Sequence, residues 1–119
     1  MNQWTAFQER APNEFDLQKD RILLWHAYQG AIVAFRDDIP RNRMYTHWMR
    51  IPVDGWIDAQ RRLPRQDDAD DLNCVLIMDE EHGAWVSGWH QVEKIKDHYA
   101  AWQQTPRPPD NYKEIRNLF

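Results

Sequence analysis

The sequence predicts a β-rich α+β fold in which two tandem small antiparallel β modules pack as one domain about a pseudo-twofold axis. The first observation is an internal repeat, because the chain matches itself at offsets of 52 to 54 residues. The second is that each copy holds two short apolar runs joined by a connection ending in Gly, which indicates a β-hairpin. The third is the content of seven Trp, four Tyr and four Phe, which supplies large side chains for a small core.

The internal repeat rests on aromatic, apolar, Gly and Pro residues at matching places. At offset 52, Trp4 and Pro12 match Trp56 and Pro64. The offset then drifts by two residues, as single-residue loop insertions would leave it. At offset 53, the run Ile22-Leu23-Leu24 matches Val75-Leu76-Ile77, and Gly30 matches Gly83. At offset 54, the matches are Phe35 with Trp89, Tyr45 with Tyr99, Trp48 with Trp102 and Pro52 with Pro106. We therefore expect a first repeat (1–52), a second repeat (53–109) and a C-terminal tail (110–119) within one compact domain.

Three strands are expected in the first repeat. The apolar run 22–25 is typical of a strand by length and composition. The connection 26–30 ends in Gly and leads to a second apolar segment, 31–35, which completes a hairpin. The segment 45–52 predicts a third strand, and its terminal Pro52 indicates a strand end, because Pro cannot donate in a central ladder.

The second repeat follows the same order, with two helical additions. Its strands are predicted at 75–78, 84–89 and 99–106. Segment 92–99 has apolar residues at a helical spacing and predicts one or two helical turns, whereas its counterpart in the first repeat contains Pro40 and is expected to be irregular. The tail has four apolar residues on one side of a short helix, namely Tyr112, Ile115, Leu118 and Phe119.

The predicted core consists of the repeated rings and the two apolar strands. A module of about fifty residues buries too little surface alone, so the two copies are expected to share a core. The single cysteine, Cys74, excludes an internal disulfide and precedes an apolar run, which predicts a small buried hydrophobe. The rings assigned to the core are Trp4, Phe35, Trp48, Trp56, Trp89 and Trp102.

Acidic residues are concentrated in the second half of the chain. Residues 1–52 hold seven Lys/Arg and six Asp/Glu, whereas residues 53–119 hold eight and thirteen. One segment holds seven carboxylates without a Lys or Arg: Asp67, Asp68, Asp70, Asp71, Asp79, Glu80 and Glu81. Such a segment is either a solvated loop or an imitation of a phosphate backbone that occupies a basic nucleic-acid channel.

The residues do not form a known catalytic or metal-binding motif. His82, His90 and His98 recur every eight residues, but zinc ligands usually lie closer together and commonly include Cys. The sole serine, Ser87, is not part of a nucleophile elbow. We therefore expect a protein that is not an enzyme and holds no cofactor or metal. A small hydrolase that uses two of the many carboxylates is retained as an alternative.

A second alternative is single-stranded nucleic-acid binding through the first repeat. Aromatic rings can stack on bases while arginines pair with phosphates. Tyr45 and Trp48 are accompanied there by Arg36, Arg41, Arg43 and Arg50. The repetition of both rings in the second copy favours a structural role for them, so nucleic acid is not the expected partner.

Several short motifs of the chain form a recognisable series. They are Trp56-Ile57, Arg62-Leu63-Pro64, Val75-Leu76-Ile77, Gly88-Trp89 and, in the first copy, the closing Thr46-His47-Trp48-Met49. With these motifs nearly the whole chain resembles, in two copies, a phage and prophage family, the domain of unknown function 551. Two positions depart from the family pattern, since Arg50 replaces its first closing proline and Ala11 replaces a leucine. The resemblance implies a phage or prophage origin and leaves the activity open.

These observations favour a binding protein that blocks or sequesters a bacterial host protein. The partner expected from a phage origin is a component of antiviral defence, such as a nucleic-acid-binding complex, which would make this chain anti-CRISPR-like. The N-terminus lacks a signal peptide and no apolar run could span a membrane, so a cytoplasmic protein is expected. Partner contacts are assigned to residues that do not recur between the copies, namely the seven carboxylates above together with Arg41, Arg43, His47 and Arg50.

Overall fold

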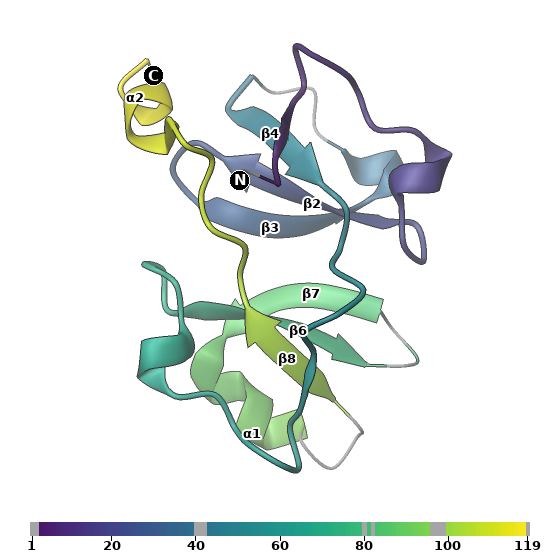
Figure 1. Cartoon of the computed structure of the whole chain (residues 1–119), viewed down its shortest axis with the longest axis vertical. Coiled ribbons are helices and arrows are strands. Elements are labelled where there is room, and N and C mark those ends of the chain that lie inside the picture. Colours follow the sequence, from purple (N-terminus) through teal and green to yellow (C-terminus); the bar gives the residue numbers. More distant parts are fainter. Residues whose placement is uncertain (1–2, 40–42, 80, 82, 96–99, 119) are drawn as a thin grey trace. The chain divides into compact units, whose positions relative to one another are not determined.

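The computed structural model describes residues 3–39, 43–79, 81, 83–95 and 100–118, and its contacts divide the chain into two compact units. The first unit comprises Met1–Ile51 and Pro106–Phe119, and the second comprises Pro52–Thr105. The last fourteen residues therefore belong with the first unit, although they follow the second in the chain. Figure 1 shows a small twisted sheet with short helical elements in each unit.

Both units contain a four-stranded antiparallel sheet with the same strand order. The first sheet has the order β1-β4-β2-β3 and the second has the order β5-β8-β6-β7. The strands are β1 (Thr5–Ala6), β2 (Arg21–His26), β3 (Gly30–Phe35), β4 (Tyr45–Met49), β5 (Ile57–Asp58), β6 (Cys74–Asp79), β7 (Gly83–Gly88) and β8 (Ala101–Gln104). The predicted fold class of two antiparallel β modules is confirmed. Each sheet has one strand more than predicted, a two-residue strand that follows the first Trp of the repeat.

Short helical elements connect the strands. Of the predicted helical segment 92–99, the structure forms α1 at Val92–Ile95, and the remainder lies outside the described residues. The predicted helix in the tail is α2, Tyr112–Arg116. The 3-10 turns are η1 (Glu14–Asp16), η2 (Arg36–Asp38), η3 (Gln66–Asp68) and η4 (Trp89–Gln91).

The offset between the repeats changes from 52 to 53 in the turn that precedes β2 in the first unit and β6 in the second. In the first unit, Gln18 and Arg21 exchange backbone hydrogen bonds across a two-residue turn, with N–O distances of 2.9 Å. In the second unit, Asp70 and Cys74 enclose three residues, and the Asp70 N–H bonds to the Cys74 carbonyl at 2.9 Å. The added residue moves the offset from 52 to 53.

The structure corrects one match of the repeat. Arg21 pairs with Phe35 in the first sheet, and Cys74 pairs with Gly88 in the second, so the counterpart of Phe35 is Gly88 and not Trp89. The predicted core changes accordingly, because Phe35 is exposed and Trp89 is only half-buried. The second added residue therefore lies after β7, on the way to β8.

The two apolar strands and the closing tryptophans, which were predicted to be buried, form a core cluster in each unit. In the first unit Ile22, Leu24 and Trp48 cluster, and in the second Val75, Ile77 and Trp102 occupy the same places. The assignment of Trp56 to the buried core is wrong, because its indole is half-buried. Cys74 is also half-buried, and burial together with the nearby Asp70 raises the pKa of its thiol. Its expected full burial is therefore wrong.

Aromatic contacts hold the C-terminal segment on the first unit. The indole N–H of Trp4 donates to the carbonyl of Arg107 at 2.6 Å. The Trp4 ring lies 5.7 Å from the ring of Trp25, edge to face, and Trp25 contacts Tyr112 of α2 in the same way at 5.9 Å. Edge-to-face pairs of this kind are favourable beyond the area that they bury.

A cluster of Arg, Trp and Asp recurs in both units. The buried indole N–H of Trp48 donates to the carbonyl of Arg10 at 2.7 Å, and the Arg10 guanidinium lies 4.7 Å from the centre of the ring. The same guanidinium bonds the Asp16 carboxylate at 3.0 Å, and that carboxylate accepts the N–H of Asn13 at 2.9 Å. This Arg–Trp–Asp cluster joins the chain before η1 to the final strand of the sheet.

The second unit repeats the cluster with Arg62, Trp102 and Asp68. The indole N–H of Trp102 donates to the Arg62 carbonyl at 2.8 Å, and Arg62 bonds Asp68 at 3.1 Å. The carboxylate accepts the N–H of Arg65 at 2.8 Å, as Asp16 accepts that of Asn13. Asp68 therefore has a counterpart in the first unit, and its assignment to the residues present in one copy alone is wrong.

The two aspartates differ in burial and in their second partner. The Asp16 side chain has no exposed surface and also accepts Arg50 Nε at 2.9 Å, whereas Asp68 is 15% exposed. Hydrogen bonds from Arg10 and from the Asn13 backbone hold the pKa of Asp16 well below its ordinary value. The Asp68 pKa is lowered by the Arg65 backbone and by Arg62.

We expect Asp16→Asn to lower the free energy of unfolding by about 2–3 kcal/mol, because it removes charge-assisted hydrogen bonds to a fully buried group. The matched Asp68→Asn change should cost about 1 kcal/mol. Since the folded-state pKa of Asp16 is depressed, its contribution is complete above about pH 4 and declines as the pH falls further. Urea unfolding between about pH 7 and about pH 2 measures both effects. A larger loss for Asp68→Asn would contradict this ranking.

Candidate binding site on the first unit

Two of the predicted acidic site residues stabilise the fold of the second unit. Asp68 belongs to the Arg–Trp–Asp cluster. Asp70 accepts the backbone N–H groups of Leu72 at 2.9 Å and Cys74 at 3.0 Å, and its second oxygen accepts the Thr105 hydroxyl at 3.0 Å. Folding therefore accounts for both carboxylates.

The other predicted carboxylates are dispersed over the second unit. Asp67 is exposed in η3, and Asp71 is exposed in the loop that precedes β6. Asp79 is half-buried at the end of β6, and Glu81 is exposed in the turn that follows. Glu80 lies outside the described residues. The exposed members remain available to a partner.

The described residues of the predicted basic patch also divide into one that stabilises the fold and two that line a pocket. Arg50 bonds Asp16 through Nε and Nη2, both at 2.9 Å, so folding accounts for this arginine. Arg41 lies outside the described residues. Arg43 and His47, by contrast, line the same pocket.

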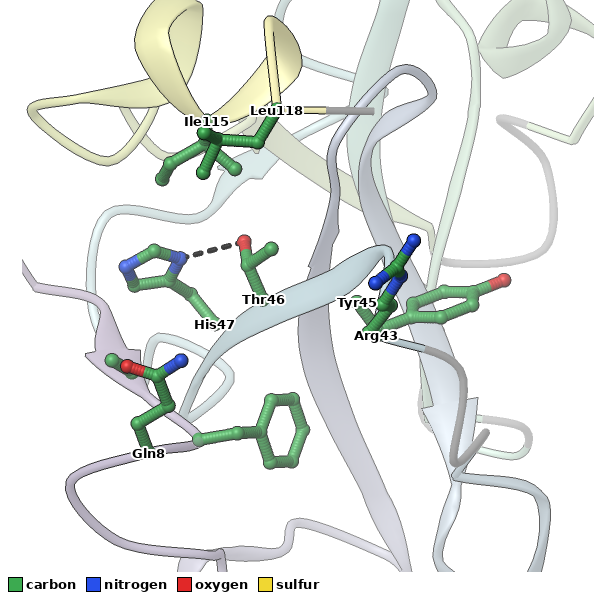
Figure 2. A pocket seen from close by; sticks show the side chains of 9 residues that line it. Gln8, Arg43, Tyr45, Thr46, His47, Ile115 and Leu118 are labelled. Carbon is green, nitrogen blue, oxygen red and sulfur yellow. Dashed lines mark hydrogen bonds between the residues drawn. The ribbon is translucent and has the colours of Figure 1, made fainter.

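This pocket has a volume of about 500 Å³ and is mainly apolar, and Figure 2 shows its side chains. Volumes of this size are typical of ligand and side-chain binding sites. The lining comes from β1 and the residues after it, from β4 and the residue Arg43 before it, and from the C-terminal helix and the turn that follows. The lining residues are Ala6, Phe7, Gln8, Arg43, Tyr45, Thr46, His47, Ile115 and Leu118.

Backbone pairing places two walls of the pocket side by side. Ala6 of β1 lies opposite His47 of β4, and the Phe7 N–H bonds the Thr46 carbonyl at 3.1 Å. Successive residues on a strand point to opposite faces, so the Ala6 and His47 side chains share one face of the sheet. Figure 2 shows Ile115 and Leu118 on the far side of His47 and Thr46 from Gln8.

The third wall, α2 and the turn after it, is held by the hairpin between β2 and β3. Arg116 Nε donates to the Ala27 carbonyl at 3.1 Å, and the Tyr28 hydroxyl donates to the Arg116 carbonyl at 3.1 Å. The Arg116 guanidinium also lies 6.0 Å from the centre of the Tyr28 ring. These contacts fix Ile115 at the pocket, while Leu118 remains 78% exposed at its edge.

His47 is the polar centre of the pocket. Its Nδ1 lies 2.8 Å from the Thr46 hydroxyl, the contact dashed in Figure 2. Burial lowers the pKa of His47, and the negative charge of Glu9 opposes this shift. At neutral pH the imidazole is therefore neutral and offers one donor and one acceptor. With Arg43 exposed nearby, the pocket combines apolar walls with a few polar groups.

The second unit has smaller residues at the corresponding positions. The Ala59 N–H bonds the Ala100 carbonyl at 3.0 Å, as Phe7 bonds Thr46. Ala101 lies opposite Asp58 in the same register that places His47 opposite Ala6. Alanines thus replace Phe7, Thr46 and His47 in a sheet of the same topology. Phe7 also packs against the core of the first unit, so folding accounts for part of this difference.

The structure excludes Trp48 as a stacking platform for the predicted nucleic-acid binder. Trp48 is only 2% exposed, its indole N–H is bonded to Arg10, and one face carries a guanidinium. A base could not reach this ring, so that part of the alternative is wrong.

Most of the pocket is not evident from the sequence. Arg43 and His47 are predicted site residues and Tyr45 is predicted to be scaffold, but no pattern connects them with Phe7, Ile115 or Leu118. A signal was present for Phe7, because offset 52 places Ala59 against it. No signal of this kind exists for α2, which has no counterpart in the other repeat.

The described residues do not contain a group of three His, Cys, Asp or Glu that could hold a metal ion. Of the three regularly spaced histidines, His82 and His98 lie outside the described residues, and His90 is exposed. Within the same described ranges, no helix combines the length and apolar character that crossing a membrane requires.

Comparisons with known proteins leave the chain without a match. No family model matches its sequence, no curated protein matches it, and no solved structure matches its fold.

We expect His47→Ala to change the free energy of unfolding by less than about 1 kcal/mol, because Ala101 occupies the same place in the second sheet. Trp48→Ala, one residue further, should cost about 3–5 kcal/mol, because it empties the core and removes the bond to Arg10. Urea unfolding monitored by circular dichroism compares the two. A loss of similar size for both variants would show that His47 is part of the scaffold.

A second histidine, His26, supports the hairpin beside the pocket. Its Nδ1 accepts the backbone N–H groups of Tyr28 at 3.1 Å and Gln29 at 3.0 Å. Its ring lies 4.8 Å from that of Tyr45, edge to face. Burial lowers the pKa of His26, so the imidazole stays neutral and accepts both bonds.

We expect stability to fall as the pH drops below about 6.5, because His26 then binds a proton more readily in the unfolded chain than in the folded one. His26→Asn retains an acceptor and should abolish this part of the pH dependence. The matched change at exposed His90, His90→Asn, should retain it. Urea midpoints between about pH 7.5 and about pH 5 test both variants, and an unchanged profile in His26→Asn would contradict the assignment.

Proposed function

We propose that this protein is a non-enzymatic binding protein that blocks or sequesters a bacterial host protein, and that it does so through the pocket of the first unit. The observation that carries the proposal is the replacement of Phe7, Thr46 and His47 by alanines in the second unit. A second sheet of the same topology forms with alanines at these positions, so the topology alone does not account for the larger side chains. The larger side chains lie around an open pocket, where they add apolar area and hydrogen-bonding groups for a partner.

A phage or prophage origin makes an antiviral defence component the partner of choice. This part of the proposal rests on the resemblance of both repeats to the domain of unknown function 551. The corresponding site of action is the bacterial cytoplasm, and the mode of action is blockade of the partner, as in anti-CRISPR proteins. The exposed carboxylates Asp67, Asp71 and Glu81 offer a second contact surface to a basic, nucleic-acid-binding partner.

We expect the wild-type protein to capture a discrete host protein from a bacterial lysate, with identification by mass spectrometry. His47→Ala and Leu118→Asp should each reduce the recovered partner at least about tenfold, as the loss of a central contact does. Val53→Asp is the matched control, because Val53 is 80% exposed against 78% for Leu118 and lies in the second unit.

Equal capture by Leu118→Asp and Val53→Asp would locate the binding surface away from the pocket. Failure of the wild-type protein to retain any host protein would contradict the proposal as a whole.

A further inference from the structure

The second unit presents a leucine that its fold does not require. Leu72 is 50% exposed and lies in the Asp70–Cys74 loop, which is one residue longer than the Gln18–Arg21 turn of the first unit. The shorter turn contains only Lys19 and Asp20, so the leucine accompanies the added residue.

This loop is held in one conformation. Asp70 accepts the N–H groups of Leu72 and Cys74 and the Thr105 hydroxyl, and Asn73 adopts a left-handed conformation with φ of 63°. A loop ordered in this way loses little conformational entropy when a partner binds it. The ordered backbone of this loop therefore presents Leu72 to solvent at a fixed position.

The charge around Leu72 is opposite to that of the first unit. Exposed Asp71 precedes it directly, and exposed Asp67 lies nearby in the chain. The second unit, 52–105, carries five Lys/Arg and eleven Asp/Glu, whereas the first unit carries ten and eight. Exposed Arg43 lines the apolar pocket, and Lys113 and Arg116 lie on α2. Glu9 is the acidic group that acts on His47.

We propose that the Leu72 loop of one copy binds in the pocket of a second copy of this chain. The leucine occupies the apolar space beside Ile115 and Leu118, and the adjoining carboxylates face Arg43 and the basic side chains of α2. The two surfaces are different, so the contact is heterologous. This inference extends the proposed function, because a second copy and a host protein then compete for the same pocket.

Sedimentation velocity of the purified full chain tests this contact. We expect the weight-average sedimentation coefficient to rise with protein concentration, and to rise less at about 0.5 M salt than at about 0.05 M, because salt screens the charges. Leu72→Asn and Leu118→Asn should each abolish the rise without changing the net charge. Val53→Asn, an exposed apolar residue of the second unit outside the loop, should leave it intact.

Mixing the two defective variants gives the decisive result. Leu72→Asn retains an intact pocket and Leu118→Asn retains an intact loop, so an equimolar mixture should form pairs that neither variant forms alone. A mixture that remains monomeric would overturn the proposal, as would association of all three variants to the same extent. A wild-type protein that stays monomeric at every concentration would overturn it too, while host capture through the pocket would still stand.

Discussion

The hydrogen bond from a buried indole to an arginine carbonyl is the constraint on which each unit depends. Trp48 and Trp102 make this bond to residues 38 and 40 positions earlier in the chain, and in each case the same arginine covers the ring and bonds an aspartate. A tryptophan so placed fills the core and also satisfies its only donor. The connection fixes the path of the N-terminal segment across the sheet. Because this hydrogen bond is present in both units, we assign its residues to the common scaffold. Residues found in one unit alone are additions to that scaffold.

The sequence pattern was sufficient to predict the strands and hairpins, because short apolar runs and the Gly residues between them determine these elements locally. It was insufficient to predict which residues of the two repeats correspond, because the pairing of the strands decides that. Offset 54 placed Trp89 against Phe35, and only the register with Arg21 identifies Gly88, at offset 53, as its counterpart. The match of Asp16 with Asp68 is visible at offset 52, but a loop carboxylate is ordinarily solvated, so its burial could not be inferred. The pocket depends on the contact of Tyr28 with Arg116, 88 positions apart in the chain, and on that of Trp4 with Arg107, 103 positions apart. No local pattern of the sequence encodes such contacts.

The two sheets share one topology, and they differ at the pocket of the first unit. The topology tolerates small side chains at three positions of the pocket. The second unit has Ala59, Ala100 and Ala101 where the first has Phe7, Thr46 and His47. The second unit departs elsewhere, in a longer loop with an exposed leucine and in its excess of carboxylates. The two departures are complementary in charge. Each copy has both the Leu72 loop and the pocket, so one copy is a ligand for the pocket of another. The protein concentration then determines how many pockets are free to bind a host partner.

The assignment of Pro106–Phe119 to the first unit has a consequence for synthesis on the ribosome. Domains generally fold in the order in which they emerge, N-terminal first. Here the contacts of Trp4 with Arg107 and of Ala27 with Arg116 can form only after the second unit has been synthesised. The second unit is contiguous and can complete its contacts first. The half of the protein that is translated earliest is therefore the last to mature, and a premature stop near residue 105 would damage the end that was made first.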